Sequence, residues 1–186
     1  MSVRENLAAI LQELYANQER IEEDHLQSMV EHVLRSNHIF LAGAGRSGVA
    51  IRGFANRLMH LGKSVSLVGD ITSPHSRTGD LLIIGSGSGE TESLLALARK
   101  AHRSGVRIGL VTMDPESSIA RLSDAVVVLP GVSPKLKGGS ALTSIQPMGS
   151  AFEQISLLTY DALILELMAR MDETTDTMFP RHADLE

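Results

Sequence analysis

Residues 81–91 read LLIIGSGSGET, an apolar run of four residues followed by a loop of glycines and hydroxyl side chains. The run is apolar on both faces of a strand, which is typical of a parallel sheet that helices cover on both sides. The loop leads into ETESLLALARKAHRSG, whose apolar residues have helical spacing. A strand that ends in such a loop and then opens a helix leaves several backbone N–H groups directed at one place. We therefore expect an anion to bind at this loop.

The same strand-then-helix pattern repeats along the chain. Five short runs rich in β-branched residues alternate with helical segments from residue 39 onward, and they read IFLAGAG, SVSLVG, LLIIGSGSG, VRIGLVT and AVVVLPG. This alternation predicts an α/β fold, a single doubly wound domain with a five-stranded parallel sheet flanked by helices. The length of 186 residues is near the usual size of one domain, so we expect the domain to span residues 1–186.

The segments on either side of the predicted sheet are helical. Apolar residues recur at helical spacing within residues 1–36, which predicts two N-terminal helices before the sheet region of residues 37–130. A long apolar helix is predicted over residues 147–171, with Pro147 at its first position, and a polar, irregular tail over residues 172–186. Because apolar residues run round most of this helix, the fold or another subunit must bury it, and we expect a homo-oligomer.

Composition and charge exclude several classes of function. The formal net charge is −5 and no long run of Lys or Arg occurs, so the chain lacks the basic footprint of a nucleic-acid-binding protein. With no cysteine, it has no disulfide, no thiolate metal site and no cysteine nucleophile. The N-terminus lacks the features of a signal peptide, and no apolar run reaches the roughly 18 residues of a membrane span. We therefore expect a cytoplasmic protein without a membrane partner.

A second glycine-rich loop, GAGRSG at residues 43–48, follows the first predicted strand. Its spacing matches the GxGxxG fingerprint of dinucleotide sites, for which Asp70 would be the ribose-binding acid. Arg46 and Ser47 suit a compact phosphate better than a pyrophosphate that bare glycine backbone approaches. Three interpretations remain open for such a loop: a dinucleotide site, a phosphate site, and a plain strand-to-helix turn with Ser and Thr as caps.

Ligands of open α/β sheets lie at the carboxyl ends of the strands, which is where both glycine-rich loops are placed. Two such loops at adjacent strand ends favour the phosphate site over the two alternatives. The predicted binding residues are Gly45, Arg46, Ser47, Ser86, Gly87, Ser88, Gly89, Glu90 and Thr91.

Five short motifs together resemble one known family. GAGRSG, RLMHLG, GDLLIIGSGSGET, PMGSAFEQ and the terminal RHADLE are similar, over nearly the whole chain, to the SIS (sugar isomerase) domain family, whose members bind phosphosugars. Within that family the set resembles isomerases that interconvert D-arabino-hex-3-ulose 6-phosphate and D-fructose 6-phosphate in the ribulose monophosphate route of formaldehyde fixation. The resemblance implies a phosphosugar substrate at the two loops and a homo-oligomer, a tetramer with sites at its subunit interfaces.

Two other functions remain open within the same family. Another phosphosugar isomerase, such as one that acts on arabinose 5-phosphate, would have similar loops. A non-catalytic domain that binds phosphosugars to control transcription is the second alternative. Such regulators usually carry a helix-turn-helix region ahead of the sugar domain, and the segment before the first predicted strand is too short and too acidic for one.

The implied reaction moves a carbonyl from C3 to C2 through a cis-enediol, which requires a base and a proton shuttle between the two oxygens, but no metal and no redox cofactor. The resemblance assigns the base to Glu153 in PMGSAFEQ and the shuttle to His60 in RLMHLG and His182 in RHADLE, and a neighbouring subunit can supply a histidine. On residue type alone, Glu153 would be a glutamate stabilised by a helix dipole, His60 a helix C-terminal residue and His182 an ordinary tail residue. Lys135 and Lys137 belong either to a lid or to a solvated loop.

Overall fold

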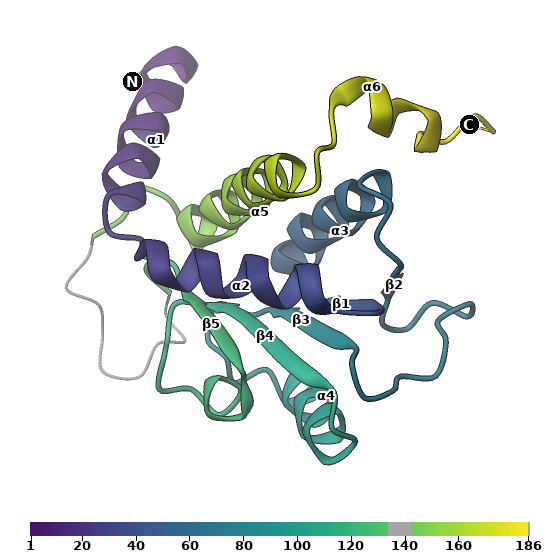
Figure 1. Ribbon diagram of the computed structural model, residues 1–186. Helices are drawn as coiled ribbons and strands as arrows, with labels where there is room; N and C mark the ends of the chain where they lie inside the picture. The colour runs from purple at the N-terminus through teal and green to yellow at the C-terminus, as the bar shows by residue number, and fades with distance from the viewer. Residues whose placement is uncertain (134–142, 186) are drawn as a thin grey trace.

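The computed structural model of the protein describes residues 1–133 and 143–185. Within these residues, five strands form one parallel sheet in the order β2-β1-β3-β4-β5, which confirms the predicted α/β fold (Figure 1). Because all the strands run in the same direction, their carboxyl ends lie at one edge of the sheet. The strands are β1 (Ile39–Gly43), β2 (Val65–Leu67), β3 (Leu81–Gly85), β4 (Arg107–Thr112) and β5 (Ala125–Val128).

Helices cover both faces of the sheet. Helices α2, α3 and α5 pack on one face, and α4 packs on the other together with the 3₁₀ turn η1 (Figure 1). Helix α1 contacts α5 and otherwise extends away from the sheet (Figure 1). The helices are α1 (Val3–Gln18), α2 (Glu23–Arg35), α3 (Gly45–His60), α4 (Glu92–Arg103), α5 (Ser150–Arg170) and α6 (Thr175–Met178), and the 3₁₀ turns are η1 (Ala120–Leu122) and η2 (Phe179–Arg181).

Strand β3 shows why an uninterrupted apolar run forms the centre of this sheet. Leu81 and Ile83 lie in the core beneath α2, α3 and α5, whereas Leu82 and Ile84 lie in the core beneath α4. All four side chains are at most 5% exposed. Burial stabilises the fold by about 1.5–3 kcal/mol for each such side chain, so both faces of the strand contribute to the free energy of folding.

Two paired glycines bring the glycine-rich loops together. Gly43 and Gly85 are the last residues of the neighbouring strands β1 and β3, and they lie opposite each other in register. Helix α3 begins at Gly45, directly after β1, and α4 begins at Glu92, after the loop that follows β3. The two loops therefore leave the sheet side by side, as predicted.

The long helix starts later than predicted. Pro147 is not its first residue, because Met148 (φ 57°) and Gly149 (φ 87°) have left-handed backbone conformations that a right-handed helix cannot contain. The helix begins at Ser150, whose backbone N–H donates to the carbonyl oxygen of Pro147 (3.0 Å). The pair of left-handed residues thus forms a turn that directs the N-terminus of α5.

The C-terminal tail, predicted to be irregular, contains α6 and η2 instead. A capping box starts α6: Thr174 Oγ1 accepts from the Thr177 N–H (3.3 Å), and Thr177 Oγ1 accepts from the Thr174 N–H (2.8 Å). Met178 then buries its side chain in the core below α3 and α5. The cap and this buried residue therefore help to hold the tail against the rest of the fold.

Large apolar side chains remain exposed on α5 and α1. The inner face of α5 is buried, but Leu157, Leu158 and Leu165 on its outer face are 43–67% exposed. Leu7 and Leu11, one helical turn apart on α1, are also more than half exposed. Within residues 1–133 and 143–185, no helix is long and apolar enough to cross a membrane.

Candidate active site

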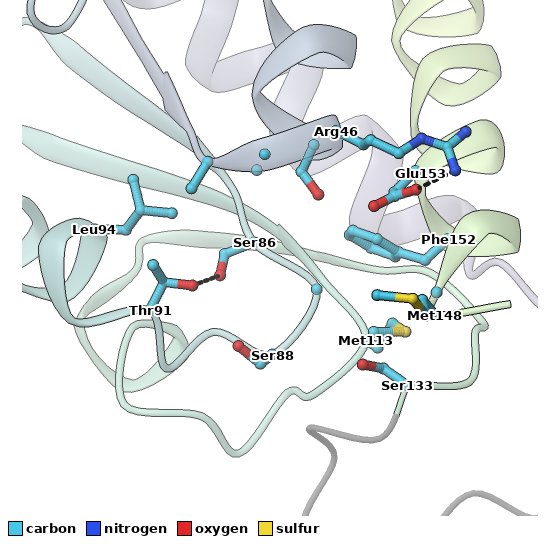
Figure 2. Close-up of a pocket in the computed structure, with 16 residues that line it drawn as sticks. Arg46, Ser86, Ser88, Thr91, Leu94, Met113, Ser133, Met148, Phe152 and Glu153 are labelled. Atoms are coloured by element: carbon cyan, nitrogen blue, oxygen red, sulfur yellow. Dashed lines mark hydrogen bonds and ion pairs between the residues drawn. The ribbon is translucent and has the colours of Figure 1, made fainter.

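The two glycine-rich loops and the start of α5 line one cavity of about 470 Å³ at the carboxyl end of β1 and β3 (Figure 2). This cavity brings together most of the residues that the sequence predicted to bind substrate. Glu153, from the first turn of α5, lies in its wall as well. The predicted residues in the lining are Gly45, Arg46, Ser47, Ser86, Gly87, Ser88 and Thr91.

Three helix N-termini meet at the cavity. Ala44, Thr91 and Gly149 precede α3, α4 and α5, and all three residues belong to the lining. None of these three residues caps its helix with a side-chain hydrogen bond. N–H groups in the first turn of each helix are therefore left for a ligand, except that of Ser150, which is bonded to the Pro147 carbonyl, and each helix adds about half a positive charge. This arrangement suits a phosphate group.

Hydroxyl groups from the second loop add further polar atoms to the wall. Ser86 Oγ lies 3.5 Å from Thr91 Oγ1 (Figure 2). Ser88 Oγ accepts a hydrogen bond from the Glu90 N–H (3.3 Å). An anion can therefore accept hydrogen bonds both from the hydroxyl groups of the loop and from the N–H groups at the start of α4.

Two of the predicted binding residues lie outside the cavity wall. Gly89 has a φ of +59°, and a Cβ there would lie 2.0 Å from Ser117 Oγ, so this glycine packs against the 117–118 segment. Glu90 turns the same way, and its Oε1 accepts a hydrogen bond from the Ser118 N–H (2.8 Å). Both residues support the loop from behind. Lys135 and Lys137 lie outside the described residues.

The described wall holds two charged side chains, Arg46 and Glu153, and they form an ion pair (Figure 2). Arg46 Nη1 lies 3.1 Å from Glu153 Oε2 and donates a hydrogen bond to Ser150 Oγ (2.9 Å). The Arg46 side chain is 62% exposed, whereas that of Glu153 is 19% exposed. Sequence reasoning placed both residues in the site but missed the contact between them. It also missed Phe152 and Met113, which form an apolar part of the wall.

His60 and His182 lie together, but away from this cavity. Their rings stack with centroids 5.2 Å apart and planes 15° apart. His60 ends α3, so it lies roughly 22 Å along the helix from Gly45 in the first cavity. The two histidines line a second cavity of about 400 Å³, with Arg57 and Asp161. Within one chain they do not meet Glu153.

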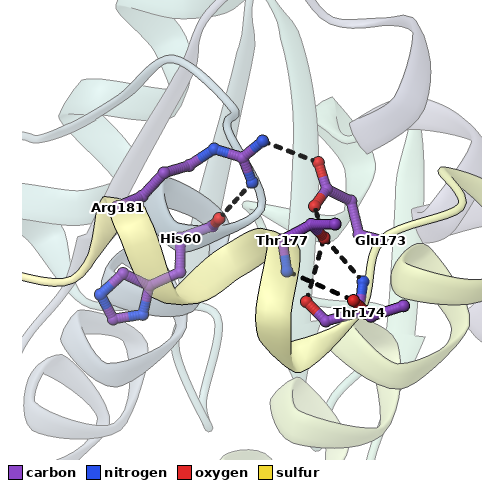
Figure 3. Close-up of polar contacts among 5 residues, drawn as sticks. All are labelled: His60, Glu173, Thr174, Thr177 and Arg181. Carbon is purple, nitrogen blue, oxygen red and sulfur yellow. Dashed lines mark hydrogen bonds and ion pairs between the residues drawn. The ribbon is translucent and has the colours of Figure 1, made fainter.

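The C-terminal tail is held against the end of α3 by Arg181 (Figure 3). Its Nη1 donates to the carbonyl oxygen of His60 (2.8 Å), and its Nη2 contacts Glu173 Oε1 (2.9 Å). The guanidinium also lies against Gly62, where a Cβ would be 3.3 Å from Arg181 Cζ. This contact places His182 over His60.

Burial is the main cause that lowers the pKa of His60, and the positive charge of Arg57 and the neighbouring His182 lower it further. The side chain of Arg57 approaches the ring, with Nη1 3.3 Å from His60 Nδ1. An arginine can only donate, so Nδ1 accepts and the ring is neutral in this arrangement. A neutral imidazole can both accept and donate a proton.

Residues 32–158 match the SIS domain family, and this match covers more than half of the chain. The chain belongs to the SIS domain family.

Known relatives resemble the chain over its full length. It is 46% identical over 186 residues to a 3-hexulose-6-phosphate isomerase of Bacillus subtilis, with complete coverage of both chains. It is 35% identical to a 3-hexulose-6-phosphate isomerase of Mycobacterium gastri, with 99% of this chain and 92% of the relative covered. A crystal structure of a Methanococcus jannaschii protein, described as inferring a molecular function of 3-hexulose-6-phosphate isomerase, has a TM-score of 0.81 at 31% identity and covers 98% of this chain and 99% of that one.

Proposed function

We propose that the protein is an isomerase that interconverts D-arabino-hex-3-ulose 6-phosphate and D-fructose 6-phosphate, the reaction of the ribulose monophosphate route. The observation that carries this proposal is the position of one carboxylate, Glu153, in the wall of a cavity at which three helix N-termini meet. A carboxylate beside a phosphate-type site supplies a base next to the bound sugar. The names of the full-length relatives support the choice of substrate.

The phosphate end of the substrate fits the second loop. The N-terminus of α4 and the hydroxyls of Ser86, Ser88 and Thr91 provide hydrogen-bond donors there. On the opposite wall, the N-terminus of α5 carries Glu153. A hexulose phosphate bound at the α4 end therefore extends toward this carboxylate, with Phe152 and Met113 against its carbon chain.

Glu153 acts as the base in this proposal. It removes the proton from C2 of the 3-ulose, and the electron pair of that C–H bond forms the C2=C3 double bond of a cis-enediol while O3 gains a proton. Collapse of the enediol forms the C2 carbonyl as O2 loses its proton, and the proton held by Glu153 returns to C3. The redox state of the molecule as a whole does not change, and the carbonyl has moved from C3 to C2.

His60 and His182 move protons between O2 and O3 in this proposal, and they do so in the cavity of a neighbouring copy. Their separation from Glu153 within one chain supports a site shared between subunits of a homo-oligomer, which we propose to be a tetramer. The exposed apolar residues on the outer face of α5 and on α1 support such an assembly, because large apolar surface is unfavourable in water.

A coupled assay tests the reaction. A separate synthase forms the hexulose 6-phosphate from formaldehyde and ribulose 5-phosphate, this protein is added, and fructose 6-phosphate is followed. We expect product from the parent protein and from Glu166→Gln, a matched change on the same helix outside the cavity, but not from Glu153→Gln. Folded protein that forms no product, or that instead converts arabinose 5-phosphate, would overturn the proposed substrate.

Mixed subunits test the shared site. Glu153→Gln and His182→Gln proteins are partly unfolded together, refolded, and assayed beside each variant alone. Recovered activity in the mixture is expected, because some sites then combine an intact Glu153 with an intact His182 from another chain. A mixture that stays inactive, or a His182→Gln variant with the parent's kcat, would reject the role of this histidine.

A further inference from the structure

Arg46 joins two helices at the mouth of the cavity. It comes from the first turn of α3, yet its Nη1 contacts two residues in the first turn of α5, Ser150 and Glu153. The directed hydrogen bond goes to Ser150 Oγ at 2.9 Å, and the Glu153 carboxylate receives the ion pair at 3.1 Å. Figure 2 shows the arginine lying across the carboxylate.

Ser150 is oriented for this contact. Its hydroxyl donates to the carbonyl oxygen of Pro147 (2.8 Å), so its hydrogen is already used. The lone pairs of Ser150 Oγ are thus left to accept from Arg46. The left-handed turn before α5, which directs the Pro147 carbonyl, therefore determines where the guanidinium is held.

The two oxygens of Glu153 have different surroundings. Oε2 is shielded from solvent and accepts no well-aligned hydrogen bond from the described residues, so the Arg46 charge is what compensates it. A buried carboxylate oxygen without such a charge would be strongly unfavourable. With Oε2 held in this way, the carboxylate cannot rotate freely, and Figure 2 shows its other oxygen pointing away from Arg46, toward the middle of the cavity.

The substrate phosphate does not need Arg46. The N-terminus of α4 and the hydroxyls of the second loop already supply donors and partial positive charge for it. An arginine that left Glu153 to bind the phosphate would also leave Oε2 buried without a partner. Both considerations favour a role for Arg46 on the base itself.

We propose that Arg46 is a positioning residue: it holds the Glu153 carboxylate, through the shared contact with Ser150, in the orientation that removes the proton from C2. This inference rests on the proposed function, in which Glu153 is the base. Its effect is on the rate of proton transfer, because misplacing a reacting group by about 1 Å can cost roughly 100-fold in rate.

Steady-state kinetics in the coupled assay test this role. For Arg46→Gln we expect kcat to fall by about 10- to 100-fold while KM for the hexulose phosphate changes by less than about threefold, since transition-state rather than ground-state binding is lost. Arg46→Lys keeps the charge on a shorter side chain with different donor geometry, and should restore part of kcat. Arg52→Gln, an exposed residue on the same helix, is the control for loss of one positive charge.

A double-variant cycle separates positioning from phosphate binding. Ser150→Ala should lower kcat less than Arg46→Gln, and the double variant should be no slower than Arg46→Gln alone, because both changes break one contact. If the fold losses in kcat of the two single variants multiply in the double variant, the two residues act independently and the inference is overturned. If Arg46→Gln fails to fold by circular dichroism, Arg46→Lys and Ser150→Ala form the same cycle.

The Glu153→Gln variant distinguishes failure of the positioning role of Arg46 from failure of the assignment of Glu153 as the base. If Glu153→Gln is inactive and Arg46→Gln raises only KM, the positioning role is overturned and the proposed function stands. If Glu153→Gln keeps the kcat of the parent, the assignment of the base fails, and the inference fails with it.

Discussion

Gly48 packs directly on the backbone of Gly43, five residues earlier in the first glycine-rich loop. A Cβ at Gly48 would lie 2.8 Å from the Gly43 carbonyl oxygen, and a Cβ at Gly43 would lie 2.9 Å from the Gly48 Cα. These are backbone atoms, which cannot move aside as the end of a flexible side chain can. The close approach lets α3 begin immediately after β1, with its N-terminus in the wall of the cavity.

Replacing Gly48 with alanine should therefore destabilise the fold. We expect the free energy of unfolding of Gly48→Ala to fall by about 1–3 kcal/mol, because the added methyl group overpacks against backbone. Gly53→Ala on the same helix is the control: its Cβ would lie 3.6 Å from Leu157 Cδ1, an ordinary contact, and the helix should gain about 0.5–1 kcal/mol. Urea unfolding of both variants measures the difference, and equal stabilities would refute the packing argument.

Thr91 tests the phosphate end of the cavity. It precedes α4 without a side-chain cap hydrogen bond, so its hydroxyl is not needed by the helix. Thr91→Val should raise KM for the phosphosugar by about 10-fold or more, because a hydrogen bond to a charged group contributes about 1.5–3 kcal/mol, while kcat changes little. Thr72→Val, in the exposed loop before β3, is the matched control. An unchanged KM would place the phosphate elsewhere in the cavity.

The stability of the protein should depend on His60 in mildly acidic solution. Burial first, then Arg57 and His182, lower the pKa of His60 below its ordinary value of 6.5. The unfolded chain then binds a proton more readily than the folded chain, so the free energy of unfolding decreases as the pH falls below about 6.5. Above that pH the contribution is fully present.

Urea unfolding at about pH 7.5 and about pH 5.5 measures this dependence in the parent protein and in His60→Gln. We expect the parent to lose more stability between the two conditions than the variant does. The pKa of His38 is also lowered by burial, but both proteins contain His38, so the difference between them reports His60. The same pH dependence in both proteins would contradict the prediction.

The Arg181 contacts should keep the C-terminal tail packed against the end of α3. Arg181→Gln removes the hydrogen bond to the His60 carbonyl and the ion pair with Glu173, so exchange of the Met178 and His182 amide hydrogens should accelerate by about 5- to 10-fold. Arg170→Gln, which breaks a more exposed ion pair between α5 and α2, should leave these amides unchanged. Equal exchange in all three proteins would show that Arg181 does not hold the tail.

Local patterns were sufficient to predict the sheet. The apolar runs of β3 and β4 predicted parallel strands buried on both faces, which the structure confirms, whereas β2 at the edge of the sheet is only half-buried. Local patterns were less reliable at the ends of helices. Pro147 is favourable at a helix start, but the left-handed residues Met148 and Gly149 separate it from α5. The tail was predicted to be irregular, although Thr174 and Thr177 in it form a capping box that starts a helix.

In the candidate site, too, some features could be predicted from local sequence and others could not. The loop residues Arg46, Ser86 and Thr91 could be placed because each follows a strand, and the strands of a parallel sheet end at one edge. The contact of Arg46 with Ser150 could not, since 104 residues separate them and no sequence spacing reports their approach. The stacking of His182 on His60 is equally non-local.

Local sequence patterns were enough to predict the class of fold and the two phosphate-type loops, because strand, loop and helix preferences act over a few neighbouring residues. The tertiary structure alone decided that Arg46 contacts Glu153 and that the histidine pair lies at the far end of α3. These contacts form only when the apolar faces of the helices are buried against the sheet. That packing sets the direction in which each helix runs. The hydrophobic burial that stabilises the fold thereby also selects which distant side chains meet.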